Sequence, residues 1–373
     1  MSEEFVWDVV VIGSGFGGAV MACRVAEAGR TVLVLERGRL YRPGEFPQSP
    51  LKMSTNVWDP SEGLFGPFHV WSFRHLDAVV SSGVGGGSLN CATVMSRMPE
   101  AWFRASAQEW PLEYSDIEKH YGTVEKMMDA EPFPPDTHRR IPQPAPLAVS
   151  FTYLSQAQRC GAEIRPLHEV KRITAINGGY ELDYVVHRPA QSPPKRVRRP
   201  SDERPVFTRV RAKTVVLAAG ALGSTWLLLA NRPGLPYLSG QLGTRFSGLD
   251  PSLGTVRLID GRLDLDWLTD GSREYVRDVW KTMMARGRAS DSRLRDVFSS
   301  LRRRTVTLHP LGGCPMGKNA LYGVVDRHGE AFGHPGLFVA DGSVLPAPVG
   351  ANPSLTIAAL AERFTNTIIE RSQ

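Results

Sequence analysis

The apolar positions of the chain are most clearly ordered near its N-terminal end. Residues 7–12 form an apolar run rich in valine, a cluster of glycines follows, and a second apolar run occupies residues 31–35. Short runs of this kind are typical of buried strands, and residues 17–28 between them have a helical pattern. The predicted order is therefore strand, tight turn, helix and strand.

The remaining elements are less evenly spaced. Residues 41–75 are rich in proline, glycine and aromatic residues without periodicity, which predicts an irregular excursion packed on the core. Helices are predicted over residues 114–130, opened by Ser115, and over residues 224–230, 273–286 and 352–369. Strands are predicted within residues 162–184, as a pair over residues 206–217, in the alternating segment 249–272 and over residues 336–342.

Length and composition limit the kind of protein. The 373 residues allow one large domain or two interleaved ones. The acidic first residues run directly into a strand, and no apolar stretch is long enough to cross a bilayer, so we expect a cytoplasmic protein without a transmembrane segment. Four scattered cysteines disfavour both a disulfide framework and a metal site.

The net charge of +6 comes with two dense basic stretches, residues 195–199 and 302–304. Prolines surround the first stretch and no aromatic residues are interleaved with it, which is typical of a solvated loop. We therefore do not expect nucleic acid as a partner.

A G-x-G-x-x-G motif stands between the first strand and the helix. In this motif Gly13 permits the tight turn, Gly15 lets a diphosphate approach the helix N-terminus, and Gly18 allows close packing of helix on strand. Glu36, at the end of the second strand, can accept a hydrogen bond from a ribose 2′-hydroxyl, and an acid there disfavours the 2′-phosphate of NADP. The motif predicts a dinucleotide but does not separate FAD from NAD.

Three further segments favour a flavin. Residues 83–88 form a glycine-rich loop whose backbone N–H groups suit a phosphate or a flat ring. Asp341, at a strand end, can direct a carboxylate to the hydroxyls of a ribityl chain. Asn352 and Pro353 open a helix whose positive end favours negative charge on the N1–C2=O edge of a reduced flavin. Together these segments predict FAD as the cofactor.

The chain resembles the glucose-methanol-choline (GMC) oxidoreductases, and within them the cholesterol-oxidase-like branch. The blocks that carry the resemblance are residues 13–18, 83–89, 217–225, 309–314, 341–343 and 349–353. They occur in the family's order and span both ends of the chain. The resemblance implies an α/β fold in which a Rossmann-like FAD-binding domain of the GMC type carries a reduced substrate-binding cap.

The same resemblance implies the site residues. His309 and Asn352 are the expected catalytic residues, which face the flavin N5 region and contact the substrate hydroxyl. An imidazole suits proton acceptance near neutral pH, and the Asn352 amide can donate to the same oxygen. Val170 is expected near the adenine. The residues expected to hold the cofactor are Gly13, Gly15, Phe16, Gly18, Glu36, Arg37, Gly83, Gly85, Gly87, Ser88, Val170, Ala219, Gly220, Asp341, Gly342, Asn352 and Pro353.

Compared with the family, the chain is short near residues 150–154 and near residues 246–251. We expect a discontinuous FAD-binding domain over residues 1–97, 151–247 and 305–373, and a residual substrate-binding cap over residues 98–150 and 248–304. The glutamate that serves cholesterol oxidases as isomerisation base has no counterpart here, so steroid isomerisation is not inferred. Natural reduction and deliberate shortening leave the same pattern.

The leading hypothesis is an FAD-dependent oxidoreductase that takes hydride from the CH–OH group of an apolar alcohol, cyclic or steroidal alcohols included. Oxygen or another electron acceptor takes up the electrons. Two alternatives stay open: desaturation of a cyclic ketone by the same flavin, and a flavin-binding remnant with little turnover. The sequence also leaves open covalent attachment of FAD and the oligomeric state; His69 and His75 stand where some relatives attach flavin.

Overall fold

The structure of the chain is a computed structural model that describes residues 7–42, 45, 56–89, 95–133, 136–142, 149–189, 206–248, 253–267, 305–350 and 352–371. For residues 131–133, 136–142 and 305 it describes the backbone alone. The helix predicted over residues 273–286 and both dense basic stretches lie outside the described residues.

The core is a seven-stranded sheet with the strand order β10, β2, β1, β13, β12, β11, in which β18 also pairs with β13. Its strands are β1 (Trp7–Ile12), β2 (Val32–Leu35), β10 (Glu163–Arg165), β11 (His168–Ile176), β12 (Gly179–Val186), β13 (Thr208–Leu217) and β18 (Leu337–Val339). β1, β2, β13 and β18 run parallel, and the apolar residues of β1 and β2 are buried. Burial on both faces is typical of parallel strands, and the predicted strand, turn, helix and strand are confirmed.

Two strand predictions are wrong. Residues 206–217 contain one long strand, β13, because no turn residue interrupts them and the strand passes from pairing with β12 to pairing with β18. The described part of residues 41–75 is not irregular throughout, since it contains β3 (Trp58–Asp59), β4 (Leu64–Phe65) and β5 (Phe68–Ser72). β5 is a strand because it pairs with β6 (Leu76–Ser81), a tertiary contact without a clear local signature.

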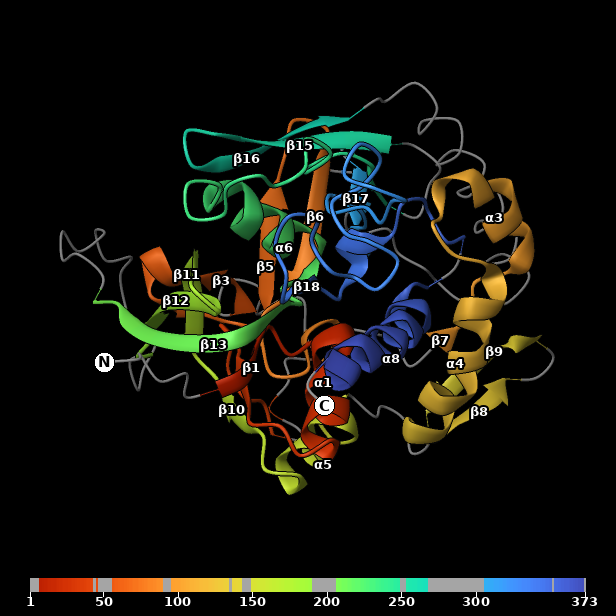
Figure 1. Cartoon of the computed structure of the whole chain (residues 1–373), viewed down its shortest axis with the longest axis horizontal. Coiled ribbons are helices and arrows are strands. Elements are labelled where there is room, and N and C mark those ends of the chain that lie inside the picture. The colour runs from red at the N-terminus through yellow and green to blue at the C-terminus, as the bar shows by residue number, and fades with distance from the viewer. Residues whose placement is uncertain are drawn as a thin grey trace, which may run out of the picture.

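A layer of helices packs against the central sheet. α1 (Phe16–Glu27) packs against α8 (Ser354–Arg371) and α5 (Tyr153–Arg159), and α4 (Tyr114–Met127) packs against α8 (Figure 1). α4 begins before Ser115, because the Asp116 carboxylate accepts the N–H of Glu113 at 3.1 Å and caps the helix. α6 (Gly220–Ala230) begins at Gly220 rather than at residue 224, because a distant carboxylate, that of Asp341, accepts the Gly220 N–H at 2.9 Å.

A smaller layer of strands lies above the central sheet in Figure 1, next to α6. One of its sheets contains β5, β6 and β17 (Thr305–Thr307), and the other contains β14 (Phe246–Ser247), β15 (Leu253–Ile259) and β16 (Arg262–Trp267). They share a hydrophobic cluster of their own that includes Phe73, Phe246 and Trp267. The hairpin of β5 and β6 thus packs with the segment predicted as cap. The domain boundaries stay a prediction.

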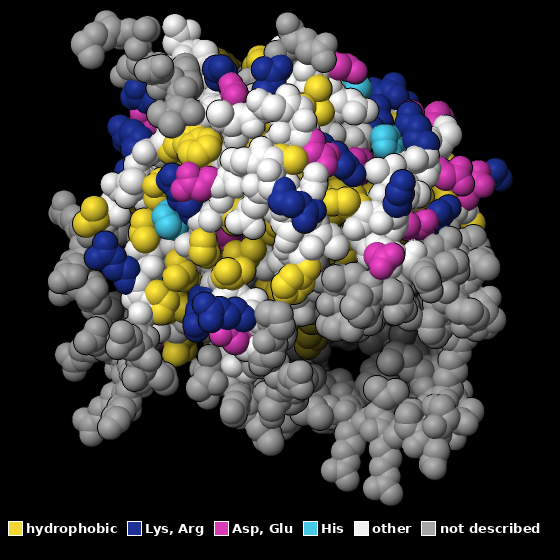
Figure 2. Space-filling view, turned by 90° about the horizontal axis from the view of Figure 1, so that it is seen from below, with side chains coloured by type: hydrophobic (Ala, Val, Ile, Leu, Met, Phe, Trp, Pro, Cys, Tyr) yellow, Lys and Arg dark blue, Asp and Glu magenta, His cyan; other side chains and the backbone are white. Residues whose placement is uncertain are grey.

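The remaining elements lie on the α4 side of the molecule in Figure 1. They are β7 (Met95–Ser96), α3 (Glu100–Ala105), η4 (Ala107–Glu109), β8 (Ala130–Phe133) and β9 (Asp136–Pro142). Figure 2 shows basic and acidic side chains interspersed over the described part of the face seen from below, so the net charge of +6 is not concentrated there. Within the described ranges, no helix combines the length and the apolar composition needed to cross a bilayer.

Candidate functional site

A cavity of about 1170 Å³ lies between the central sheet and the smaller layer of strands. Its wall includes the turn after β1, Glu36, and the segments that carry His309 and Asn352. The carboxyl ends of parallel strands are where open α/β sheets bind ligands, and pockets for small molecules usually measure about 300–1,000 Å³. This cavity is therefore large enough for an extended dinucleotide.

The turn after β1 requires glycine for two reasons. Gly13 has a φ of +96°, and a Cβ there would lie 2.4 Å from the carbonyl oxygen of Ala218. A Cβ at Gly18 would lie 2.2 Å from the carbonyl oxygen of Gly13, so α1 packs closely on the turn. Gly15, the N-cap of α1, brings no side chain to cap the helix. The positive end of the helix thus meets the cavity at Gly15 and Phe16, where a phosphate fits.

Two further residues of this turn matter, although the motif does not specify them. A Cβ at Gly17 would lie 1.5 Å from the carbonyl oxygen of Ala340, so any side chain there would push β18 away from the helix. The Ser14 hydroxyl donates to Glu36 at 2.7 Å and accepts the N–H of Gly85 at 3.1 Å. Ser14 therefore links the first glycine turn to the glycine-rich loop. The only sequence signal for Gly17 is that it is one more glycine in the cluster.

Glu36 is buried in the cavity wall, with its side chain held on both oxygens. Oε2 accepts the N–H and the hydroxyl of Ser14, at 3.1 and 2.7 Å, and Oε1 accepts the N–H of Gly38 at 2.8 Å. A carboxylate accepts about four hydrogen bonds, so capacity for one ribose hydroxyl remains. This donor set fits the predicted role of the residue.

The glycine-rich loop lies against the first turn. A Cβ at Gly86 would lie 2.7 Å from the Cα of Gly15, and both Gly85 and Gly86 have positive φ, +106° and +51°. The Ser88 hydroxyl donates to the Gly85 carbonyl at 2.7 Å and keeps the loop tight. Gly86 and Gly87 line the cavity, whereas Gly83, Gly85 and Ser88 do not and shape the loop instead. Gly18 likewise lies outside the lining.

Asp341 is buried at the start of the turn after β18, where it accepts four hydrogen bonds. Oδ2 accepts the Gly220 N–H at 2.9 Å and the Ser224 hydroxyl at 2.5 Å. Oδ1 accepts the N–H and the hydroxyl of Ser343, at 2.8 and 2.6 Å. Burial raises the pKa of Asp341. A ribityl hydroxyl would therefore compete with an existing donor, and the carboxylate chiefly holds Gly220 and Gly342 at the cavity wall.

His309 and Asn352 line the same cavity from different segments. Burial lowers the pKa of His309, so its imidazole is neutral at pH 7 and able to accept a proton. The Oδ1 atom of Asn352 accepts the N–H and the hydroxyl of Ser354, at 3.2 and 3.0 Å. This cap uses the oxygen of the amide and fixes its orientation at the start of α8. The other predicted cofactor residues that line the cavity are Arg37, Val170, Ala219 and Pro353.

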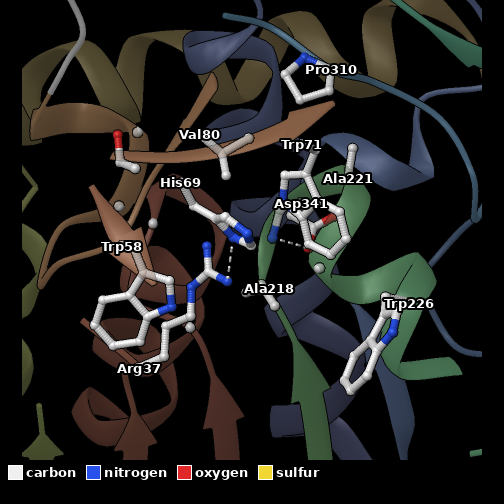
Figure 3. Close-up of a pocket in the computed structure, with 18 of the residues that line it drawn as sticks. Arg37, Trp58, His69, Trp71, Val80, Ala218, Ala221, Trp226, Pro310 and Asp341 are labelled. Carbon is white, nitrogen blue, oxygen red and sulfur yellow. Dashed lines mark hydrogen bonds between the residues drawn. The ribbon is translucent and has the colours of Figure 1, made fainter. Parts of the chain in front are cut away.

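The sequence does not predict the aromatic part of the wall, although one of its residues, His69, stands where some relatives attach flavin. Trp58 from β3, and His69 and Trp71 from β5, line the cavity beside Arg37, and Trp226 of α6 lies on the opposite side (Figure 3). The His69 and Trp71 rings lie 4.7 Å apart. The aromatic content of residues 41–75 is the one sequence signal for this wall.

Comparisons with known proteins match two family models to parts of this chain. The GMC oxidoreductase C-terminal family matches residues 254–361, and a NAD(P)-binding Rossmann-like domain matches residues 11–41. A cholesterol oxidase of Acinetobacter baumannii is 24% identical and covers 98% of this chain and 95% of its own length. That alignment spans 541 positions, whereas this chain has 373 residues, so it contains long gaps on this chain's side.

Two further proteins show how the likeness is distributed. A long-chain-alcohol oxidase, FAO4B of Arabidopsis thaliana, is 43% identical over 65 residues, which cover 17% of this chain and 9% of that protein. The crystal structure of pyridoxine 4-oxidase from Mesorbium loti superimposes with a TM-score of 0.64 at 15% identity, covering 97% of this chain and 99% of that one. The structural likeness concerns the fold, and it extends over nearly the whole chain.

Proposed function

The chain belongs to the GMC oxidoreductase family, in its cholesterol-oxidase-like branch, and from this premise we propose that it uses FAD to oxidise the CH–OH group of an apolar alcohol. The observation that carries the proposal is that the dinucleotide turn, His309 and Asn352 all line one cavity. The residues present fit the cofactor. The glycine turn after β1, the N-terminus of α1 without a side-chain cap, and the Glu36 carboxylate, which can accept one more hydrogen bond, lie together.

Two residues of this cavity have roles in the proposed reaction beside FAD, one in accepting a proton and one in orienting the substrate. FAD, when bound, supplies the acceptor of the hydride that leaves the carbinol carbon. The neutral imidazole of His309 accepts the proton of the substrate hydroxyl, so that the alcohol loses one hydride and one proton and becomes a carbonyl compound. The amide of Asn352 orients the same oxygen through its nitrogen end, since its oxygen end caps α8.

Apolar side chains near His309 support an apolar substrate. Leu308 and Pro310 flank it in sequence, and Trp226, Leu263 and Ile357 also line the cavity. Figure 3 shows Pro310, Ala221 and Trp226 on the side of the cavity away from Arg37 and Trp58. Because the matched relatives include cholesterol oxidases and long-chain-alcohol oxidases, oxygen is the proposed electron acceptor.

The test is anaerobic mixing of the FAD-loaded protein with long-chain alcohols, 3-hydroxysteroids and the matching cyclic ketones, while the flavin absorbance is followed. We expect alcohols to bleach the flavin, and air then to restore its colour with release of hydrogen peroxide. His309→Ala should slow bleaching by about 10²- to 10⁴-fold. His328→Ala, a partly buried histidine outside the cavity lining, is the matched control.

Two outcomes would contradict the proposal. Unchanged bleaching by alcohols in the His309→Ala protein would remove His309 from the reaction. Faster bleaching by ketones than by alcohols, with an unsaturated ketone as product, would favour desaturation.

A further inference from the structure

One charged side chain of the cavity wall has no acidic partner among the described residues. Arg37 lies in the wall, and burial lowers the pKa of its guanidinium, as expected for a cation without a counter-charge. Two carboxylates act on it through space, those of Glu36 and Glu169. Neither pairs with it, because Glu36 is held by Ser14 and Gly38, and Glu169 binds Lys171 and His187, each at 2.8 Å.

Neutral groups hold Arg37 instead. Its Nη1 atom lies 3.0 Å from Nδ1 of His69, and its guanidinium lies 5.7 Å from the centre of the Trp58 ring (Figure 3). A guanidinium only donates hydrogen bonds, so Nδ1 of His69 accepts, and the ring proton of His69 is on Nε2. Burial and the charge of Arg37 lower the pKa of His69 to about 3, which keeps the imidazole neutral.

This arrangement fixes the position of the charge without neutralising it. A guanidinium has five N–H donors in one plane, and His69 occupies one of them. The planar fork of the remaining donors matches two oxygens of a phosphate group. Arg37 also follows Glu36 directly in sequence, at the end of β2, which neighbours β1 and the diphosphate turn.

We propose that Arg37, positioned by His69, binds a phosphate group of the adenosine end of the dinucleotide. His69 is a positioning residue that acts through Arg37. The inference rests on the proposed function for the dinucleotide itself. FAD carries phosphate only in its 5′-diphosphate, which is the proposed ligand of Arg37. The same chemistry would admit the ribose 2′-phosphate of NADP, which Glu36 disfavours.

The test measures the dissociation constant of FAD from the full-length holoprotein, by the rise in flavin fluorescence on dilution. We expect Arg37→Leu to raise this constant by about 10- to 100-fold, as for loss of a charged hydrogen bond. Arg37→Lys keeps the charge but loses the planar set of N–H donors. Its dissociation constant for FAD should lie between those of Arg37→Leu and the wild-type protein. His69→Phe should weaken FAD binding. His69→Gln keeps a hydrogen-bond acceptor for Arg37 and should bind FAD about as tightly as the wild-type protein.

Displacement of FAD by smaller ligands locates the contact. In the wild-type protein ADP should displace FAD better than adenosine does, and Arg37→Leu should reduce that advantage by about 10- to 100-fold, leaving the part that the N-terminus of α1 supplies. If Arg37→Leu weakened the binding of 2′-AMP alone and left that of ADP unchanged, the assignment to the diphosphate would be overturned. The proposal would be overturned if Arg37→Leu weakened the binding of adenosine and of ADP by the same factor. It would also be overturned if Arg37→Leu left the dissociation constant of FAD unchanged. A protein that binds FAD through Arg37 but oxidises no alcohol would contradict the proposed function alone.

Discussion

Single residues fix how closely the segments around the cavity approach one another. Gly350 is an example. It stands two residues before Asn352 and has a φ of +66°. A Cβ at Gly350 would lie 2.2 Å from the indole ring of Trp102, a residue of α3. The backbone at Gly350, just before Asn352, therefore packs directly against the ring of Trp102, which is distant in sequence.

We expect Gly350→Ala to slow anaerobic flavin reduction by alcohol and to lower the melting temperature. The alanine must adopt a left-handed conformation, at a cost of about 1–2 kcal/mol, and must also displace the Trp102 ring. Gly240→Ala is the control, since a Cβ there meets no atom within 4 Å. Adding Trp102→Ala to Gly350→Ala should recover part of the rate. Equal behaviour of both glycine variants would refute the positional role of this contact.

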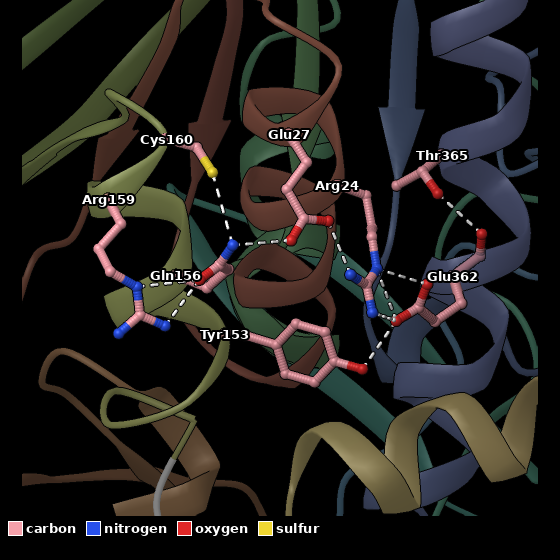
Figure 4. A network of polar contacts seen from close by, with 8 residues as sticks. All are labelled: Arg24, Glu27, Tyr153, Gln156, Arg159, Cys160, Glu362 and Thr365. Carbon is pink, nitrogen blue, oxygen red and sulfur yellow. Dashed lines mark hydrogen bonds and ion pairs between the residues drawn. The ribbon is translucent and has the colours of Figure 1, made fainter.

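At the scale of elements, one polar network joins the helices that frame the site (Figure 4). Arg24 of α1 donates from Nε and Nη2 to Glu362 of α8 at 2.9–3.0 Å, and the Tyr153 hydroxyl of α5 donates to the same carboxylate at 2.7 Å. The side chain of Glu362 is 7% exposed, and that of Arg24 is 22% exposed. The network therefore connects the first helix of the chain to the last in a mostly buried place.

Glu362→Gln should lower the free energy of unfolding by about 3 kcal/mol, because it leaves the partly buried Arg24 with only the more exposed Glu27 as counter-charge. Glu27→Gln is the matched control. Glu27 also pairs with Arg24, at 2.7 Å, but its side chain is 31% exposed, and exposed pairs contribute about 0–1 kcal/mol. The measurement is urea unfolding at one fixed FAD concentration. Equal losses in the two variants would show that burial does not set the strength of this network.

At the scale of the whole molecule, side chains of two hydrophobic clusters line the cavity. Ile12 and Leu35 come from the main cluster, and Phe73 and Leu263 come from the smaller one. A ligand that fills the cavity contacts both clusters in the folded chain and neither in the unfolded chain. Bound cofactor should thus act as part of the core.

The expected consequence is a melting temperature that rises with FAD concentration. Ligand at one hundred times its dissociation constant adds about 2.7 kcal/mol to the stability of the folded state. Thermal unfolding followed by circular dichroism at several FAD concentrations, with riboflavin as a control that lacks the adenosine diphosphate, measures the effect. A melting temperature independent of FAD would mean that the cavity is not the cofactor site.

The sequence by itself determined the dinucleotide turn and the acid that follows it. Gly13, Gly15, Gly18 and Glu36 lie within one short unit of two strands and one helix, although Gly13 also packs against the distant Ala218. Local backbone rules, namely the need for positive φ and for close helix packing, are enough to predict such a unit. The C-terminal helix was predictable for the same reason, since Asn352 and Pro353 mark its start.

Only the tertiary structure decided the rest of the cavity. His69 reaches the wall because β5 pairs with β6, and β6 pairs with β17, which lies much later in the chain. Trp58 reaches it because β3 pairs with β4 and contacts β5. The start of α6 depends in the same way on Asp341, which is 121 residues away from Gly220. Periodicity reports how a segment alternates between buried and exposed faces, but not which distant segment covers it. The pairing of Arg37 with His69 is therefore a product of the fold.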